Sequence, residues 1–156
     1  MDIEENGAQC AEATPAKIDV FHGNYRWLSN FWPVVVHLDG VAYPTVEHAY
    51  QAAKTTDPVL REQIRRLPTP GGAKRAAKMI QVQDDWQDVK RDIMYNLVLE
   101  KFSDQILKEH LLATGNAILI EGNLWHDTYW GVCRGVGENH LGRILMQVRS
   151  SLRESA

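Results

Sequence analysis

The segment Tyr43–Lys54 constrains this chain most, because it leads from the end of a strand into a helix whose polar residues share one side. Pro44 and Thr45 suit the start of that helix, where a threonine side chain can cap free backbone amides. At 3.6 residues per turn, one face collects Glu47, Tyr50, Gln51 and Lys54. Two interpretations fit this face: a solvated surface with a weak polar network, or the wall of a site in which a carboxylate and an amine act on a ligand.

The surrounding pattern predicts an α+β fold, a single compact and mainly helical domain with a short β-hairpin and a small sheet. Residues 34–38 and 41–43 flank the pair Asp39–Gly40, a strong hairpin signal. A proline directly after Asp57 and another after Thr69 mark two helix starts. Helices are expected over residues 58–67, 70–78, 85–101, 103–113 and 138–153, and short strands over 17–21 and 117–121, the second of them buried.

Apolar residues indicate which sides of the last two helices face the core. In the helix over 103–113, Ile106, Leu107 and Leu111 are expected to point inward. The helix over 138–153 carries an amphipathic stripe made of Leu141, Ile144, Leu145, Val148 and Leu152. These stripes predict that both helices pack against one core.

Length and charge limit the classes of protein that fit. A chain of 156 residues predicts one domain, expected over 17–156 and preceded by a flexible tail over 1–16. A net charge of −3 argues against a surface that coats nucleic acid. The sequence lacks a long apolar run and an apolar signal peptide, so we expect a cytoplasmic protein with no membrane partner. Cys10 and Cys133 make no disulfide framework, and without metal-ligand spacings we expect no metal or cofactor.

Two aromatic-rich loops, over residues 22–33 and 122–131, are candidates to meet the polar helix face in one cleft. Aromatic side chains in loops need burial against the core or against a flat ligand. A shared cleft would combine the carboxylates of Glu47 and Asp127, the minimal pair for acid and base cleavage of a glycosidic bond. Its aromatic and cationic groups would be Trp27, Trp86, Trp125, Trp130, Arg26, Lys54 and Lys74, which suit a heterocyclic base and a phosphate.

Four segments resemble the YbiA-like, NADAR-domain family: Leu28–Phe31, Tyr43–Lys54, Tyr129–Gly131 and Gly137–Arg149. The resemblance spans about residues 18–152 and implies an N-glycosidase. Some members hydrolyse phosphoribosylamino-pyrimidine intermediates of riboflavin synthesis, and others remove ADP-ribose from guanine bases. The resemblance implies functional roles for Glu47, Trp86 and Asp127. The chain departs from the family pattern at Val132, where many members have an aspartate.

We therefore expect hydrolysis of the bond between ribose C1′ and an exocyclic amine nitrogen, with a small phosphoribosylamino-pyrimidine as the leading substrate. The catalytic candidates are Glu47, Asp127, Trp86 and Lys54, and the substrate-binding candidates are Arg26, Asn30, Phe31, Tyr50, Lys74, Trp125 and Trp130. Either carboxylate could be the acid, and a desolvated Lys54 could instead form a Schiff base with the opened sugar. The alternatives are a hydrolase that removes ADP-ribose from guanine, with ADP-ribosylated DNA as partner, and a non-catalytic reader of ADP-ribose or nucleotides.

Overall fold

A computed structural model describes residues 13–155. The helices of this part are a 3-10 helix (Gly23–Leu28), α1 (Val46–Ala52), α2 (Pro58–Arg65), α3 (Pro70–Ala77), α4 (Trp86–Lys101), α5 (Gln105–Ala113) and α6 (His140–Glu154). The strands are β1 (Lys17–Ile18), β2 (Val36–Leu38), β3 (Val41–Tyr43), β4 (Ile118–Leu119), β5 (Gly122–Asn123) and β6 (Val132–Cys133). β1 pairs with β4 and β5 with β6 in parallel, and β2 pairs with β3 antiparallel. The predicted mixture of helices and small sheets is confirmed.

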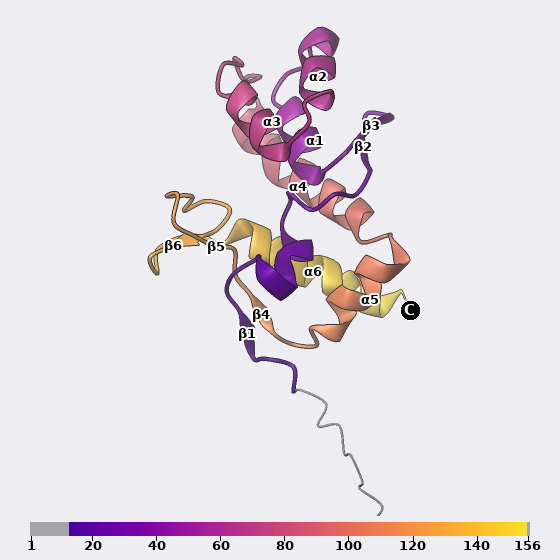
Figure 1. The fold of residues 1–156 in the computed structure, drawn as a ribbon, viewed down its shortest axis with the longest axis vertical. Helices are drawn as coiled ribbons and strands as arrows, with labels where there is room; N and C mark the ends of the chain where they lie inside the picture. The colour runs from indigo at the N-terminus through magenta and orange to yellow at the C-terminus, as the bar shows by residue number, and fades with distance from the viewer. Residues whose placement is uncertain (1–12, 156) are drawn as a thin grey trace, which may run out of the picture.

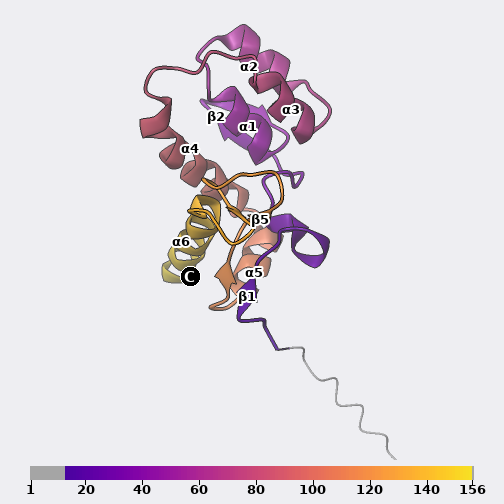
Figure 2. The same ribbon diagram turned by 90° about the vertical axis from the view of Figure 1, so that its left-hand side faces the viewer.

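Helix α4 joins two groups of elements (Figure 1). Helices α1, α2 and α3 and the β2–β3 hairpin lie at one end of the molecule, and α5, α6, β1 and β4 lie at the other. Helix α4 packs against both α1 and α6. The segment that carries β5 crosses between the two groups (Figure 2). Residues from both halves of the sequence therefore meet in the middle of the molecule.

Local sequence signals account for the hairpin and for most helix starts. Asp39 and Gly40 both have positive φ, of 49° and 79°, as the two-residue turn that matches strand twist requires. A side-chain oxygen accepts a backbone N–H at the start of four helices, at Thr45, Asp57, Thr69 and Asp104. Pro58 and Pro70 begin α2 and α3. The predicted hairpin and the helix starts at Thr45, Asp57 and Thr69 are confirmed, whereas the helix predicted from residue 103 begins at Gln105, after the cap at Asp104.

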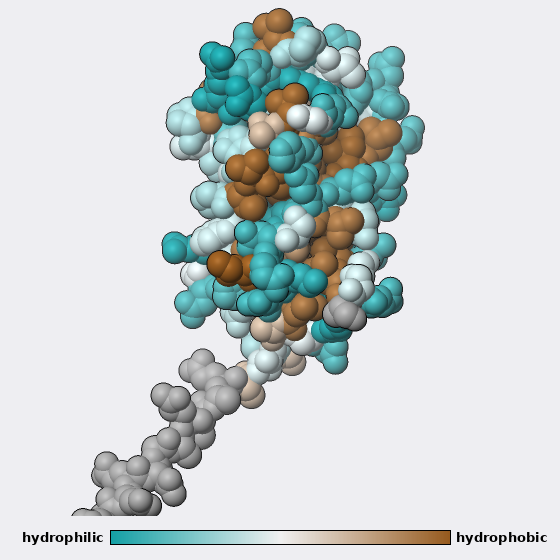
Figure 3. All heavy atoms as spheres, turned by 90° about the vertical axis from the view of Figure 1, so that its right-hand side faces the viewer, coloured by the Kyte–Doolittle hydropathy of each residue, from teal (hydrophilic) through white to brown (hydrophobic). Residues whose placement is uncertain are grey.

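The hydrophobic core includes the apolar stripe of α6, which is buried from Leu141 to Leu152 as predicted. The prediction for α5 is wrong at Ile106, which is 67% exposed, whereas Leu107 and Leu111 are buried. Leu107 and Leu111 are four residues apart and share a face, while Ile106 lies about 100° around the helix from Leu107. Figure 3 shows a face on which apolar and hydrophilic residues are interspersed. Single exposed apolar side chains such as Ile106 are a normal feature of protein surfaces.

The two outer strands are shorter than predicted. β1 and β4 pair only over residues 17–18 and 118–119. Within the described residues, β1 and β4 form a sheet of only these two strands. Each strand therefore ends where its single partner strand turns away. Leu119 is fully buried but Ile118 is 53% exposed, so the strand predicted as buried is buried on one side only. The first aromatic loop is also more regular than expected, because it begins with the 3-10 helix.

Most of the predicted tail over 1–16, including Cys10, falls outside the described residues. Residues 13–15 are exposed and have no regular secondary structure. Cys133 is buried in β6. Along residues 13–155, every helix is too short or too polar to cross a membrane.

Candidate active site

The polar face of α1 is buried, so the interpretation of this face as a solvated surface is wrong. Glu47, Tyr50 and Gln51 are only 7%, 6% and 4% exposed. Helices α2, α3 and α4 pack around α1, and its polar side borders a cavity of about 1370 Å³. Burial of polar groups is costly unless they bind one another or a ligand.

The cavity brings together most of the predicted site residues. It is lined by Asn30, Phe31, Glu47, Tyr50, Lys54, Lys74, Trp125, Asp127 and Trp130. Val132, the position of the departure from the family pattern, also lines it. In Figure 2 the segment that carries β5 lies between α1 and α3 on one side and β1 and α5 on the other. This crossing explains how the second aromatic loop reaches the polar face of α1.

Three side chains predicted for the shared cleft, Arg26, Trp27 and Trp86, are not among the described residues that line the cavity. The Trp27 ring instead packs against Phe102 and His110. The Arg26 guanidinium instead lies 5.6 Å from the centre of the Trp32 ring. Trp86 is 4% exposed, and its ring centre lies 5.2 Å from that of Tyr50. The first turn of α4 faces α1, and this directs the apolar indole into the core. Trp86 is therefore positioned to support Tyr50, and direct stacking of Trp86 on a ligand does not fit its position.

Glu47 is held from two sides in the first turn of α1. Its backbone N–H donates to the carbonyl oxygen of Asn30 at 3.1 Å, and its Oε1 accepts a hydrogen bond from Gln51 Nε2 at 2.7 Å. Burial raises the pKa of the Glu47 carboxyl, and the Gln51 hydrogen bond and the amines of Lys74 and Lys54 oppose this effect. The carboxyl is thus fixed in position, and its charge depends on its neighbours.

Two buried oxygens at the cavity have no hydrogen-bond partner among the described residues: Asn30 Oδ1 and Gln51 Oε1. The amide nitrogens of the same side chains are engaged, by Met94 Sδ at 3.4 Å and by Glu47. Buried polar atoms in folded proteins are nearly always paired. Both oxygens are unpaired but shielded from solvent, so a ligand would reach them only after a shift of the two side chains.

Asp127 lies in a turn that its own side chain stabilises. Its Oδ1 accepts the backbone N–H groups of Tyr129 and Trp130, at 3.1 and 2.9 Å. The side chain of Asn123 accepts the N–H of Asp127 at 3.1 Å and donates to its carbonyl oxygen at 2.8 Å. Within residues 13–155 these hydrogen bonds leave Oδ2 of Asp127 unengaged, so the turn holds a carboxylate oxygen ready for a ligand or water.

Tyr50 and Trp130 form an aromatic wall of the cavity. Trp130 Nε1 donates to the Tyr50 hydroxyl at 3.1 Å, and the two rings lie at 89° to each other. Burial raises the pKa of Tyr50, so the phenol stays neutral at physiological pH. Tyr129 packs on Trp130 with a centre-to-centre distance of 4.9 Å, and Lys90 lies over the Tyr129 ring. Tyr129 and Lys90 therefore support the Trp130 ring of this wall.

Lys54 and Lys74 place two amines beside the carboxyl groups. Burial lowers the pKa of Lys54, while the Glu47 carboxylate opposes this shift. Lys74 Nζ lies 5.6 Å from the centre of the Trp125 ring, which connects α3 with the second aromatic loop. Positive charge is thus available both next to Glu47 and towards the loop.

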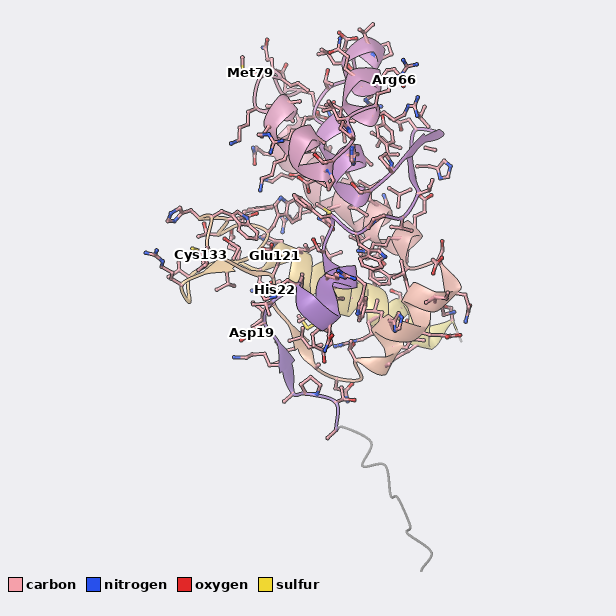
Figure 4. The ribbon with its side chains drawn as sticks, in the orientation of Figure 1. Asp19, His22, Arg66, Met79, Glu121 and Cys133 are labelled. Carbon is pink, nitrogen blue, oxygen red and sulfur yellow. The ribbon has the colours of Figure 1, made fainter. Side chains whose placement is uncertain are left out.

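Sequence reasoning missed Glu121, which also lines the cavity. Burial raises the pKa of this carboxyl to about 7. In Figure 4 Glu121 lies on the same side of the molecule as His22 and Asp19, two more residues of the cavity lining. Its place at the end of an expected strand, directly before an aromatic loop, lies close to the predicted site in sequence but does not by itself identify it. In residues 13–155 no three acidic, histidine or cysteine side chains converge as metal ligands.

The fold and the cavity define a class of protein: a small α+β domain with separate carboxyl groups, two amines and an aromatic wall around one cavity. Such a site suits acid and base chemistry on a ligand with aromatic and anionic parts. The model of the NADAR domain family matches residues 20–153. The chain belongs to this family, which confirms the resemblance noted in the sequence.

Named relatives agree with this assignment. The N-glycosidase YbiA of Escherichia coli strain K12 is 38% identical over 135 residues, which cover 83% of this chain and 82% of that protein. A riboflavin biosynthesis protein of Vibrio vulnificus strain YJ016 is 39% identical over 137 residues, 85% of this chain but only 37% of that longer protein. The NMR structure of E. coli YbiA superposes with a TM-score of 0.81 at 33% identity, covering 94% of this chain and 91% of that one.

Proposed function

We propose that this protein is an N-glycosidase that hydrolyses the bond between ribose C1′ and an exocyclic amine nitrogen of a base. The observation that carries the proposal is the buried Glu47 carboxyl, which shares one cavity with Asp127, Lys54 and an aromatic wall. Cleavage of such a bond needs a proton at the leaving nitrogen, a directed water and stabilisation of positive charge at C1′. Carboxyl groups in different environments can supply all three.

In the acid and base route, Glu47 and Asp127 have different roles, one at the sugar carbon C1′ and the other at the leaving nitrogen or the attacking water. One carboxylate stabilises the oxocarbenium-like C1′, and the other carboxyl group protonates the leaving nitrogen or orients the attacking water. Glu47 is fixed by Gln51 and by the Asn30 carbonyl, and Asp127 is fixed by the two backbone amides on its Oδ1. Rigid placement of both groups favours catalysis, since small misplacements of reacting groups lower rates strongly.

The polar atoms of the cavity wall suggest how a nucleotide-like substrate binds. A rotation of the Asn30 and Gln51 amides would bring their unpaired buried oxygens to ribose hydroxyl or base amine groups of the substrate. The base would stack against the wall formed by Tyr50 and Trp130, and Lys74 would bind the phosphate. Each of these contacts uses a group that lines the cavity.

Lys54 provides a second route, in which its neutral amine attacks C1′ of the opened sugar, the base leaves as its free amine with a proton, and the resulting Schiff base is later hydrolysed by water. Burial, which lowers the pKa of Lys54, favours the neutral amine that this step needs. Borohydride treatment during turnover distinguishes the routes. A reduced adduct on Lys54 would establish the Schiff base, and its absence would leave the acid and base route.

We propose a phosphoribosylamino-pyrimidine as the substrate class, because the relative from V. vulnificus is named a riboflavin biosynthesis protein. A specific observation favours ADP-ribosylated guanine as the second candidate: the cavity of about 1370 Å³ exceeds the roughly 300–1,000 Å³ of common small-molecule sites. Purified protein should be incubated with each compound, and release of ribose 5-phosphate or of ADP-ribose measured. Release of neither, with intact ligand recovered in bound form, would indicate a non-catalytic reader.

A further inference from the structure

Glu121 is fixed through both its backbone and its side chain. Its N–H donates to Asn139 Oδ1 at 3.0 Å, and its carbonyl oxygen accepts from the N–H of Val132 at 2.8 Å. Its Oε2 accepts from Asn123 Nδ2 at 3.1 Å. Because the same Asn123 amide also donates to the Asp127 carbonyl, Glu121 belongs to the frame that positions Asp127.

Gly131 makes room for the Glu121 carboxyl. A β-carbon at residue 131 would overlap both Oε2 and the backbone carbonyl oxygen of Glu121. Gly131 directly follows Trp130, whose indole forms part of the aromatic wall. The Glu121 carboxyl therefore packs against the backbone of the residue that follows Trp130, and Glu121 and Trp130 both line the cavity.

Charged groups on three elements act on Glu121. Burial raises its pKa most, and the Asn123 hydrogen bond opposes this. Asp127 on the same loop and Glu47 on α1 raise the pKa further, whereas Lys74 on α3 lowers it. The carboxyl consequently holds its proton to about pH 7, which is the range in which a general acid is most effective at neutral pH.

We propose that Glu121 is a catalytic residue, the general acid that gives its proton to the leaving amine nitrogen. This inference rests on the proposed function and refines it. Glu121 lines the same cavity as Trp130 and packs against Gly131, the residue that follows this indole, whereas Glu47 lies on α1 next to Lys54 and Gln51. Glu47 and Asp127 are then free to act on C1′ and on water.

The proton and electron balance of this step is complete. The bond between C1′ and nitrogen breaks, its electron pair stays on nitrogen, and nitrogen takes the proton of Glu121. Water adds its oxygen to C1′ and gives one proton to the carboxylate acting as base. Solvent returns a proton to Glu121 and removes one from the base. The net reaction is the hydrolysis of one glycosidic bond.

The experiment compares Glu121→Gln with wild type on two ribose 5-phosphate glycosides, one with the natural amine leaving group and one with 4-nitrophenolate, which departs without a proton. For the amine glycoside, kcat/KM should fall by at least about 100-fold. For the nitrophenyl glycoside the loss should stay below about threefold, because no acid is needed. Equal losses on both glycosides would overturn the proposal, since they would indicate a purely structural role.

Two controls separate this inference from the proposed function. Asp19→Asn removes a carboxyl that also lines the cavity but is 57% exposed, and this variant should keep the wild-type ratio of the two rates. Carbon-13 NMR of the Glu121 carboxyl, which needs no turnover, should report titration near pH 7; titration near pH 4.5 would overturn the proposal. A wild-type protein that cleaves neither glycoside would contradict the proposed function itself.

Discussion

The residues of the cavity combine burial with incomplete pairing. Asn30 and Gln51 each use their amide nitrogen within the protein and leave a buried oxygen unpaired among the described residues. Such atoms usually cost free energy when no partner is present. A ligand whose donor groups reached these shielded oxygens through a shift of the two side chains would recover this cost.

Gly131→Ala should damage the site more than its size suggests. The new β-carbon would overlap Glu121 Oε2 and its backbone carbonyl oxygen, so the loop must shift. We expect the free energy of unfolding to fall by about 1–3 kcal/mol and kcat to fall at least tenfold, because the Glu121 carboxyl is displaced. Thermal unfolding and steady-state kinetics check both.

Gly71→Ala is the matched control for this prediction. A β-carbon at residue 71 meets only the end of the Arg75 side chain, at an ordinary contact distance of 3.5 Å. This variant should keep both stability and kcat. A Gly131→Ala protein as active as the Gly71→Ala protein would show that the position of Glu121 does not matter for turnover.

At the scale of elements, Lys101 connects α4 with the first aromatic loop. The side chain is 1% exposed, and its Nζ donates to the carbonyl oxygen of Ser29 at 2.8 Å. The next residue, Asn30, accepts the backbone N–H of Glu47 through its carbonyl oxygen. A buried amine at the end of α4 thus holds the loop that holds the first turn of α1.

The variant Lys101→Met tests this connection through the pH dependence of the free energy of unfolding. Burial lowers the pKa of Lys101 to about 7, from 10.5, so between these values the folded protein binds fewer protons than the unfolded chain. The free energy of unfolding therefore rises as pH increases from about 7 to 10.5. The variant should lose the part of this rise that Lys101 contributes, and its kcat should fall by about tenfold because the loop loosens.

Chemical denaturation at several pH values measures the stability part of this prediction. Lys78→Met, which changes an exposed lysine at the end of α3, should keep the wild-type pH dependence. An unchanged pH dependence in Lys101→Met would contradict the assignment of this rise to Lys101.

Elements that depend on neighbouring residues could be predicted from the sequence. The Asp39–Gly40 turn and the caps at Thr45 and Thr69 are set within a few residues, and each is found as expected. Glu121 could not be predicted, because the parallel pairing of β5 with β6 and a hydrogen bond from its N–H to Asn139 determine its place. These contacts join residues far apart in the loop and helix, and no local pattern encodes them.

Contacts between distant residues also explain why Trp130 lines the cavity whereas Trp86 does not. Trp130 lines the cavity because the turn around Asp127 fixes its backbone. Trp86 has an equally polar sequence neighbourhood, but the packing of α4 against α1 places its ring behind Tyr50. The sequence predicts that both indoles need partners; only tertiary packing determines whether the partner is the core or a ligand.

At the scale of the whole molecule, the cavity lies where the two halves of the chain meet, so a bound ligand should stabilise the entire fold. Ribose 5-phosphate, the expected product, should raise the Tm of wild type. The free energy of unfolding should increase with the logarithm of the ligand concentration above Kd, by about 2.7 kcal/mol at 100 times Kd. Differential scanning fluorimetry measures this shift.

Lys74→Gln should weaken the stabilisation by ribose 5-phosphate, because Lys74 lines the cavity and is assigned to the phosphate. We expect Kd to increase about tenfold. Lys78→Gln, at the exposed end of the same helix, is the control and should respond to ribose 5-phosphate as wild type does. Equal Tm shifts in Lys74→Gln and in wild type would contradict the phosphate role of Lys74.

Turnover of a phosphoribosylamino-pyrimidine by wild type and by Glu47→Gln, measured side by side as release of ribose 5-phosphate, tests the central claim most directly. Glutamine keeps the shape of the buried side chain but cannot act as a carboxylate. Wild type should release ribose 5-phosphate, and Glu47→Gln should be slower by about two orders of magnitude or more while unfolding at a similar temperature. Near-normal turnover by Glu47→Gln would contradict the assignment of this cavity as the active site of an N-glycosidase.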